Sequence, residues 1–298
     1  MPTDFVQVDA FTRRPLYGNP AAVVFDADDI PAATMQQIAR EMNLSETVFI
    51  LKPSTPDADY RVRIFTPMSE LPFAGHPTVA AAHAVLARYA DKADATLLRQ
   101  ECGIGIVPVE VIRSASGTLL RMTQGTPTYR ETALTRSTVA KMLGCAESDL
   151  SERPFEVVST GVPWLIVELS RLDAISTLAP DQGLIARECK ALRAAGITVF
   201  VERNDHSPVR IRVRTFAPGE GVAEDPVCGS GNGCVAAYIA HHKHPSDKAG
   251  SYLAEQGIEI NRDGEIHASW EREGDNLRIK IGGEAAVSAS GQLYLNQP

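Results

Sequence analysis

Two stretches of the chain share one pattern of apolar and polar positions. In residues 61–86 and again in residues 210–240, a run that alternates with a period of two leads into an acidic loop. Each loop is followed by a turn that contains glycine and then by an alanine-rich apolar segment. Alternation with a period of two predicts a strand, and a long apolar segment after a Gly-turn predicts a buried helix. Both stretches therefore predict the order strand, loop, Gly-turn, helix.

The two stretches match residue by residue at the turns. Pro72 precedes Pro226 by the same number of residues as Gly75 precedes Gly229. A weaker match lies upstream, where residues 18–25 and 160–167 each place a turn before an apolar strand. An internal repeat of this kind indicates a duplicated supersecondary plan.

The remaining pattern adds one amphipathic helix and several strands. A helix is predicted after Asp28–Pro31, because the apolar residues that follow have helical spacing, namely Met35, Ile38, Ala39 and Met42. Strands are predicted in residues 45–51, 119–123, 156–158, 258–260 and 277–281. Asp263-Gly264 predicts a hairpin turn.

Strands outnumber helices in this pattern, so the predicted fold class is α+β. We expect two duplicated lobes, each a mixed, mostly antiparallel sheet wrapped around one central helix. The length of 298 residues suits two lobes of about 150 residues each. The predicted boundaries are 1–124 for the N-terminal lobe, joined by a C-terminal strand at 285–298, and 125–284 for the C-terminal lobe.

Composition excludes several classes of function. The net charge of −8 comes without a basic stripe, which argues against nucleic acid or an anionic membrane as partner. No signal peptide and no membrane span are predicted, and the five scattered cysteines are typical of reduced thiols. The spacing of Cys228 and Cys234 is too wide for a zinc knuckle, so no metal site is predicted. We expect a cytoplasmic protein.

The paired Gly-turns give the strongest chemical signal. A Gly-turn that opens a helix exposes backbone N–H groups, and the helix dipole adds partial positive charge. Such an end binds a carboxylate or stabilises an oxyanion. Two ends of this kind predict a small anionic ligand, although Gly75 and Gly229 can also serve tight backbone geometry alone. A nucleotide site is disfavoured, because residues 229–233 lack the Lys-Ser/Thr ending of a P-loop.

Glu46 is the first candidate for proton transfer. It lies between the amphipathic helix and an apolar strand, where partial loss of water would suit a carboxyl group that both takes and returns a proton. Its position alone also fits a solvated loop residue or a capping partner of Asn43.

Three further side chains lie at the turns. His76 is at the start of the first helix, where the dipole favours its neutral form, but a histidine there can simply be a cap. Asp225 can orient a substrate amine or hydroxyl, or can form a turn before Pro226. Cys228, at a helix start, is expected to favour the thiolate, although a buried cysteine is also a common core residue.

These residues stand in motifs that together resemble one family. The motifs are Val8–Phe11, Gly18–Ala21, Glu41–Thr47, Phe65–Pro67, Leu71–Thr78 and Glu224–Pro226. In this order, from about residue 5 to the C-terminus, the chain resembles the PhzF-like proteins of phenazine biosynthesis. The resemblance implies the two-lobed fold of diaminopimelate epimerase.

The resemblance also implies roles for individual residues. Glu46 would move a proton between two carbons of trans-2,3-dihydro-3-hydroxyanthranilate, with no cofactor and no metal. His76, Asp225 and Ser230 would surround the substrate with the amides at Gly75 and Gly229. Asn19 and Ser45, which stand in the matching motifs, are also expected to bind substrate, and a homodimer is expected.

The second turn departs from the family pattern. Epimerases and racemases of this fold use a cysteine at each turn, whereas this chain has Cys228 but Ala74. A reaction with two thiols is therefore excluded. Two alternatives stay open beside the single-base isomerase: an amino-acid epimerase that pairs Cys228, as an accessory thiol, with Glu46 or His76, and a homologue that binds a small molecule without catalysis.

Overall fold

The computed structural model describes residues 2–115, 117–203, 207–274 and 276–295. The chain divides into two compact units. Lobe 1 comprises Met1–Thr123 and Gly282–Pro298, and lobe 2 comprises Gln124–Ile281. Each lobe is described by itself below.

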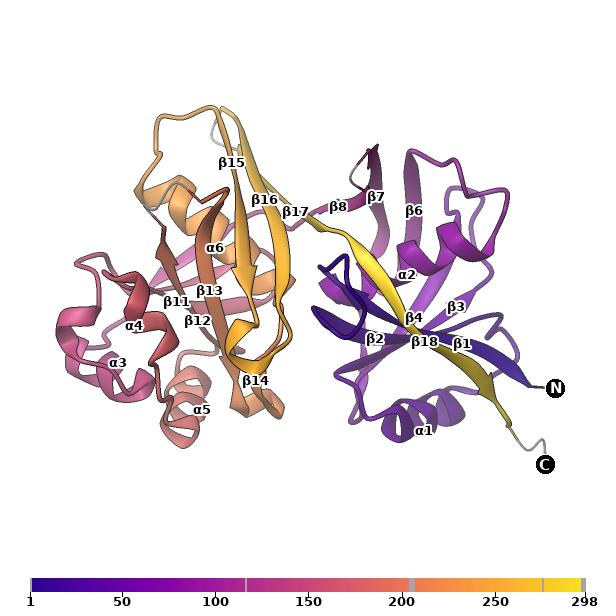
Figure 1. Ribbon diagram of the computed structural model, residues 1–298, viewed down its shortest axis with the longest axis horizontal. Coiled ribbons are helices and arrows are strands. Elements are labelled where there is room, and N and C mark those ends of the chain that lie inside the picture. The colour runs from indigo at the N-terminus through magenta and orange to yellow at the C-terminus, as the bar shows by residue number, and fades with distance from the viewer. Residues whose placement is uncertain (1, 116, 204–206, 275, 296–298) are drawn as a thin grey trace. The chain divides into compact units, whose positions relative to one another are not determined.

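The sheet of lobe 1 wraps around helix α2 (Gly75–Arg88), as Figure 1 shows. Its strands run in the order β18, β1, β2, β3, β4, β6, β7, β8, and β5 pairs with β4. Only the β2–β3 and β4–β6 pairs among these are parallel. The bounds are β1 (Thr3–Ala10), β2 (Asn19–Val24), β3 (Glu46–Leu51), β4 (Tyr60–Phe65), β5 (Glu70–Leu71), β6 (Leu97–Cys102), β7 (Gly105–Ser114), β8 (Gly117–Thr123) and β18 (Ala285–Leu293).

Helix α1 (Ala32–Met42) covers the other face of β3 and β4. Its residues Met35, Ile38 and Ala39 are buried against Phe49 and Phe65, as the helical spacing predicts. Strand β3 is therefore covered on both faces, which explains its unbroken apolar run after Glu46. Helix α2 is buried on nearly all sides, which its alanine-rich sequence allows because small side chains let the surrounding strands approach closely.

Lobe 2 has the same plan around helix α6 (Gly229–His242). Its strand order is β9, β10, β11, β12, β13, β15, β16, β17, with β14 on β13. The bounds are β9 (Thr128–Glu131), β10 (Glu156–Ser159), β11 (Pro163–Glu168), β12 (Gly196–Glu202), β13 (Val209–Ala217), β14 (Val222–Asp225), β15 (Ala249–Gln256), β16 (Gly264–Glu273) and β17 (Asn276–Gly283). Helices α3 (Arg136–Leu143), α4 (Leu172–Ser176) and α5 (Gln182–Ala191) bury the opposite face of β11 and β12.

The strand registers show that the lobes are duplicates. The parallel pair β2–β3 corresponds to β11–β12, and β4–β6 corresponds to β13–β15. Thr47 pairs with Phe65 in lobe 1 just as Ile197 pairs with Phe216 in lobe 2. Helices α2 and α6 begin at the matched glycines and have 14 residues each. The predicted repeat is therefore confirmed at the level of individual residues.

One prediction for the C-terminal region was wrong, and the predicted hairpin turn is longer than two residues. Residues 258–260 form a 3-10 helix, Ile258–Ile260, and not a strand. This helix lies between Gly257 and Asn261, which both have left-handed backbone, so the chain turns where the apolar alternation suggested extension. The hairpin turn therefore spans the residues between Gln256 and Gly264, which pair with each other, and Gly264 is the first residue of β16.

Within the described residues, no helix is both long and apolar enough to cross a membrane.

Candidate active site

Glu46 is the first residue of β3, directly after the end of α1. The helix ends because Asn43 adopts left-handed backbone at its C-cap and donates its N–H to Ala39 O. Ser45, partly buried, connects this cap to the strand. Glu46 then pairs with Ala21 of the parallel strand β2. The junction predicted from the sequence therefore exists and fixes the backbone of Glu46.

The alternation of β2 and β3 decides which way Glu46 faces. Val24, Phe49 and Leu51 belong to the core cluster with α1, so the alternate positions face α2. Glu46 and Asn19 are among these alternate positions, and Asn19 is buried at the start of β2. The structure thus brings two of the predicted site residues to one face of the lobe 1 sheet.

His76 meets Glu46 on this face. It is the second residue of α2, and its Nε2 lies 3.0 Å from Oε2 of Glu46. Both side chains are largely buried, with exposed fractions of 9% for His76 and 15% for Glu46. A carboxylate in contact with an imidazole can exchange a proton with it or be oriented by it. This pair is the first part of the candidate site.

The start of α2 lacks a side-chain cap. Its N-cap is Ala74, which has no side chain that caps the helix, and no acidic residue lies in the first turn. The helix dipole and the N–H groups of this turn are therefore not neutralised by the helix's own residues. Gly75 and Gly229, both described, do not have left-handed backbone. A left-handed turn is thus not the reason for either glycine.

In lobe 2, Asp225 ends β14 and Cys228 is the N-cap of α6. The Cys228 Sγ accepts a hydrogen bond from Gly231 N at 3.3 Å and lies 3.5 Å from Ser230 Oγ. Gln256, the last residue of β15, accepts from Cys228 N and donates to the Asp225 carbonyl at 2.9 Å. This glutamine therefore holds both ends of the turn that carries the predicted residues.

The expectation of a thiolate at Cys228 is wrong. Burial raises the pKa of the Cys228 thiol well above its usual range, and the charge of the neighbouring Asp225 carboxylate raises it further. The hydrogen bonds with Ser230 and Gly231 lower the pKa of the thiol, but by less than burial and the Asp225 charge raise it. The helix start therefore does not offset the loss of water, and burial favours the neutral thiol.

Two glutamines that sequence reasoning missed support the helix starts. The fourth residue of α6, Asn232, donates to Gln256 Oε1 at 2.8 Å. The fourth residue of α2, Thr78, accepts from Gln100 Nε2 at 2.9 Å. All four side chains are fully buried or nearly so. The sequence did contain a signal for these glutamines. Thr78 and Asn232 match in the repeat, and Gln100 and Gln256 are polar residues at positions of a strand that face the core.

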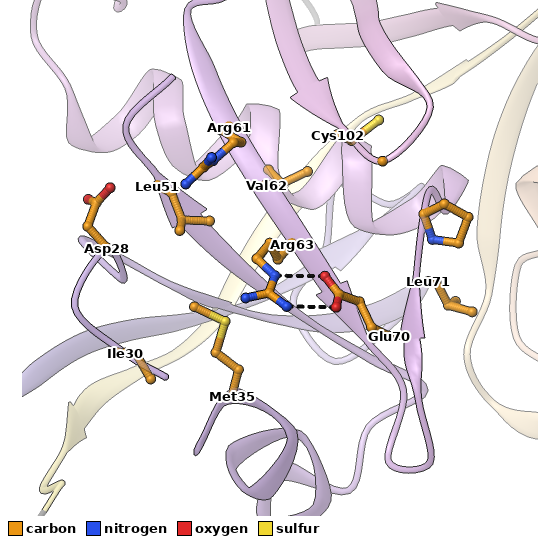
Figure 2. A pocket seen from close by; sticks show the side chains of 12 residues that line it. Asp28, Ile30, Met35, Leu51, Arg61, Val62, Arg63, Glu70, Leu71 and Cys102 are labelled. Carbon is orange, nitrogen blue, oxygen red and sulfur yellow. Dashed lines mark hydrogen bonds and ion pairs between the residues drawn. The ribbon is translucent and has the colours of Figure 1, made fainter. Parts of the chain in front are cut away.

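A surface pocket in lobe 1 lies elsewhere, on β4 near α1 (Figure 2). It is lined by Asp28, Ile30, Met35, Leu51, Arg61, Val62, Arg63, Glu70, Leu71, Pro72, Cys102 and Gly103. Arg63 points to Glu70 and binds both of its carboxylate oxygens at 2.7 Å. Two arginines face two carboxylates in this pocket, so its charge favours neither an anion nor a cation. It contains none of the predicted site residues.

No group of three His, Cys, Asp or Glu side chains is placed to hold a metal ion in the described ranges. In lobe 1 the contact joins Glu46 to His76, with Ser45 and Gly75 as their chain neighbours and Asn19 on the same face of the sheet. In lobe 2, Asp225, Cys228, Gly229 and Ser230 lie on one turn and the helix start that follows it.

Comparison with solved structures defines the class of fold. A PhzF-family protein of Bacillus anthracis superposes with a TM-score of 0.90 at 29% identity, covering 99% of this chain and 100% of that one. A hydroxyproline epimerase of Agrobacterium vitis superposes with a TM-score of 0.64 at 15% identity, covering 98% and 91%. At that identity the likeness shows the fold alone. The predicted two-lobed, epimerase-like fold class is thereby confirmed.

Sequence comparison then gives the family. The family of phenazine biosynthesis-like proteins matches residues 8–291. A trans-2,3-dihydro-3-hydroxyanthranilate isomerase of Pseudomonas aeruginosa is 36% identical over 294 residues, covering 98% of this chain and 99% of that protein. Further relatives also carry the name isomerase. The chain belongs to the PhzF-like family and is an isomerase of that family.

Proposed function

We propose that this isomerase moves a proton within a small carboxylate-bearing substrate, with Glu46 as the acid/base. The observation that carries the proposal is the contact of Glu46 with His76 at the uncapped start of α2. The relatives named trans-2,3-dihydro-3-hydroxyanthranilate isomerase support a substrate of that class. No cofactor takes part in the proposed reaction.

The proposed step conserves every atom of the substrate. The Glu46 carboxylate takes a proton from one carbon, and the electron pair of the broken C–H bond moves into the adjacent double-bond system. The carboxylic acid then returns the proton to a second carbon of the same molecule. His76 orients the Glu46 carboxylate, and Asp225 holds an amine or hydroxyl of the substrate. The N–H groups at Gly75 and Gly229, with Asn19, Ser45 and Ser230, bind its polar groups.

The test is incubation of the enzyme with trans-2,3-dihydro-3-hydroxyanthranilate in D2O, followed by proton NMR. We expect isomerised product with deuterium at the carbon that receives the proton, because the Glu46 carboxylic acid exchanges its proton with D2O before it protonates that carbon. A panel of cyclic amino acids, including hydroxyproline, tests the epimerase alternative in the same buffer. Exchange at the α-carbon of an amino acid, without exchange in the dihydroanthranilate, would contradict the proposal.

Replacing Cys228 with Ser should leave the rate of isomerisation within about threefold of the original. Serine is a good N-cap, and the Cys228 thiol neither gives nor takes a proton in the proposed reaction. Treatment with iodoacetamide at pH 8 should leave the activity intact, since only a thiolate is alkylated rapidly and burial raises the pKa of this thiol. Activity and the mass of the Cys228 peptide are measured in parallel. Inactivation that a bound carboxylate prevents would instead favour the epimerase with Cys228.

A further inference from the structure

The indole of Trp164 is bonded directly to the start of α6. Trp164 lies in β11 with an exposed fraction of 5%, and its Nε1 donates to Ser230 Oγ at 3.0 Å. An indole N–H is only a donor, so Ser230 must use an oxygen lone pair in this bond. Trp164 therefore leaves the hydroxyl proton of Ser230 available and fixes the position of its oxygen.

That proton has a weak partner in the structure. In the described part of the chain, the other polar contact of Ser230 Oγ is Cys228 Sγ at 3.5 Å. A thiol sulfur is a weak acceptor, whereas a carboxylate oxygen is a strong one. An anion that reaches Ser230 would therefore replace the sulfur as the acceptor of its hydroxyl proton.

The duplicated fold shows which position Trp164 occupies. Ser230 is the second residue of α6, as His76 is the second residue of α2. Trp164 pairs with Gly196, the first residue of β12, as Ala21 pairs with Glu46, the first residue of β3. Trp164 thus occupies the position of Ala21 and contacts the second residue of α6, whereas in lobe 1 the second residue of α2 is contacted by Glu46 from the neighbouring strand.

Gly196 is required by this arrangement. A Cβ at position 196 would lie 2.8 Å from the Trp164 ring and 2.1 Å from the backbone oxygen of Phe216. A carboxylate side chain therefore does not fit at the position that corresponds to Glu46. The indole fills the space, and an N–H donor faces the helix start in place of a proton acceptor.

We propose that Trp164 is a positioning residue that orients Ser230 to bind the carboxylate of the substrate. Together with Gly196, it makes the start of α6 an anion-binding site and not a second site of proton transfer. The inference rests on the proposed function in one respect, namely that the bound anion is the carboxylate of the substrate.

The test is the affinity for anthranilate, measured by isothermal titration calorimetry, because binding can be measured without turnover. Trp164→Phe keeps a ring but removes the N–H, and we expect it to raise the Kd about five- to tenfold. Ser230→Ala should raise the Kd by at least as much, and adding Trp164→Phe to it should cause no further loss, since the indole acts through the hydroxyl. Trp270→Phe is the matched control. Trp270 is buried to a similar degree, and its Nε1 has no hydrogen-bond partner in the described chain.

A second measurement needs no substitution at Trp164. The chain has two tryptophans, so a ¹H–¹⁵N spectrum shows two indole signals, which Trp270→Phe assigns. Anthranilate should shift the Trp164 signal and not the Trp270 signal, and Ser230→Ala should remove that shift. Additive losses in the double variant, an unshifted Trp164 signal, or no binding of anthranilate by the wild type would each overturn the inference. If the binding and NMR results are as expected but the enzyme gives no isomerised product in D2O, the proposed reaction is wrong and the anion site at α6 is still supported.

Discussion

Replacing Glu46 with Gln should lower the rate of solvent-deuterium incorporation by about 10²–10⁴-fold, the range that a positioned general acid/base contributes. Glutamine keeps the length of the side chain but cannot take a proton at its amide oxygen. Its contact with His76 can persist, because an amide and an imidazole can still form a hydrogen bond. The loss should therefore appear in kcat, with a much smaller change in the Kd for anthranilate.

A matched control lies five residues earlier in the same segment. Glu41 is an exposed residue of α1, and Glu41→Gln changes the net charge equally without reaching the site. We expect this variant to exchange deuterium at the original rate. Both variants should unfold thermally at the original temperature within a few degrees. Exchange by Glu46→Gln at more than about a tenth of the original rate would remove Glu46 from the proton-transfer step.

The chain's own repeat made the fold and part of the site predictable. Gly75 and Gly229, matched at one offset, are the first residues of two helices of equal length. Glu46 was marked by its place between an amphipathic helix and an apolar strand, and both elements formed as expected. These features are local, so a linear sequence contains them.

The parts that could not be predicted depend on contacts across long sequence separations. Nothing near Ser230 in the sequence indicates that the indole of Trp164 reaches it from β11. The prediction of a thiolate at Cys228 was wrong for a similar reason. The helix start is visible in the sequence, but the burial that raises the pKa of the thiol results from the strands packed around α6. Local motifs show which groups are present, and tertiary packing sets their protonation.

A further expected result concerns two arginine–glutamate pairs that the duplication placed in equivalent positions. Arg214 donates two hydrogen bonds to Glu224 at 2.9 and 2.8 Å, just as Arg63 binds Glu70. Each guanidinium also lies over a phenylalanine two residues later, Phe216 or Phe65. The geometry is therefore the same, but the burial differs. The lobe 2 side chains are 7% and 12% exposed, whereas those of Arg63 and Glu70 are 30% and 43% exposed.

Replacing Glu224 with Ala should lower the free energy of unfolding by about 3–5 kcal/mol, because it leaves the Arg214 guanidinium buried without its main partner. The Glu259 carboxylate, 4.0 Å from Arg214 Nε, already binds Arg212 at 2.6 Å and can compensate only in part. Glu70→Ala should cost about 0–1 kcal/mol, since water can solvate the exposed Arg63. Urea denaturation of the two variants measures the difference. Equal losses would mean that burial does not set the cost of breaking these pairs. A larger loss for Glu224→Ala, accompanied by weaker binding of anthranilate, would tie the buried pair to the turn that begins at Asp225.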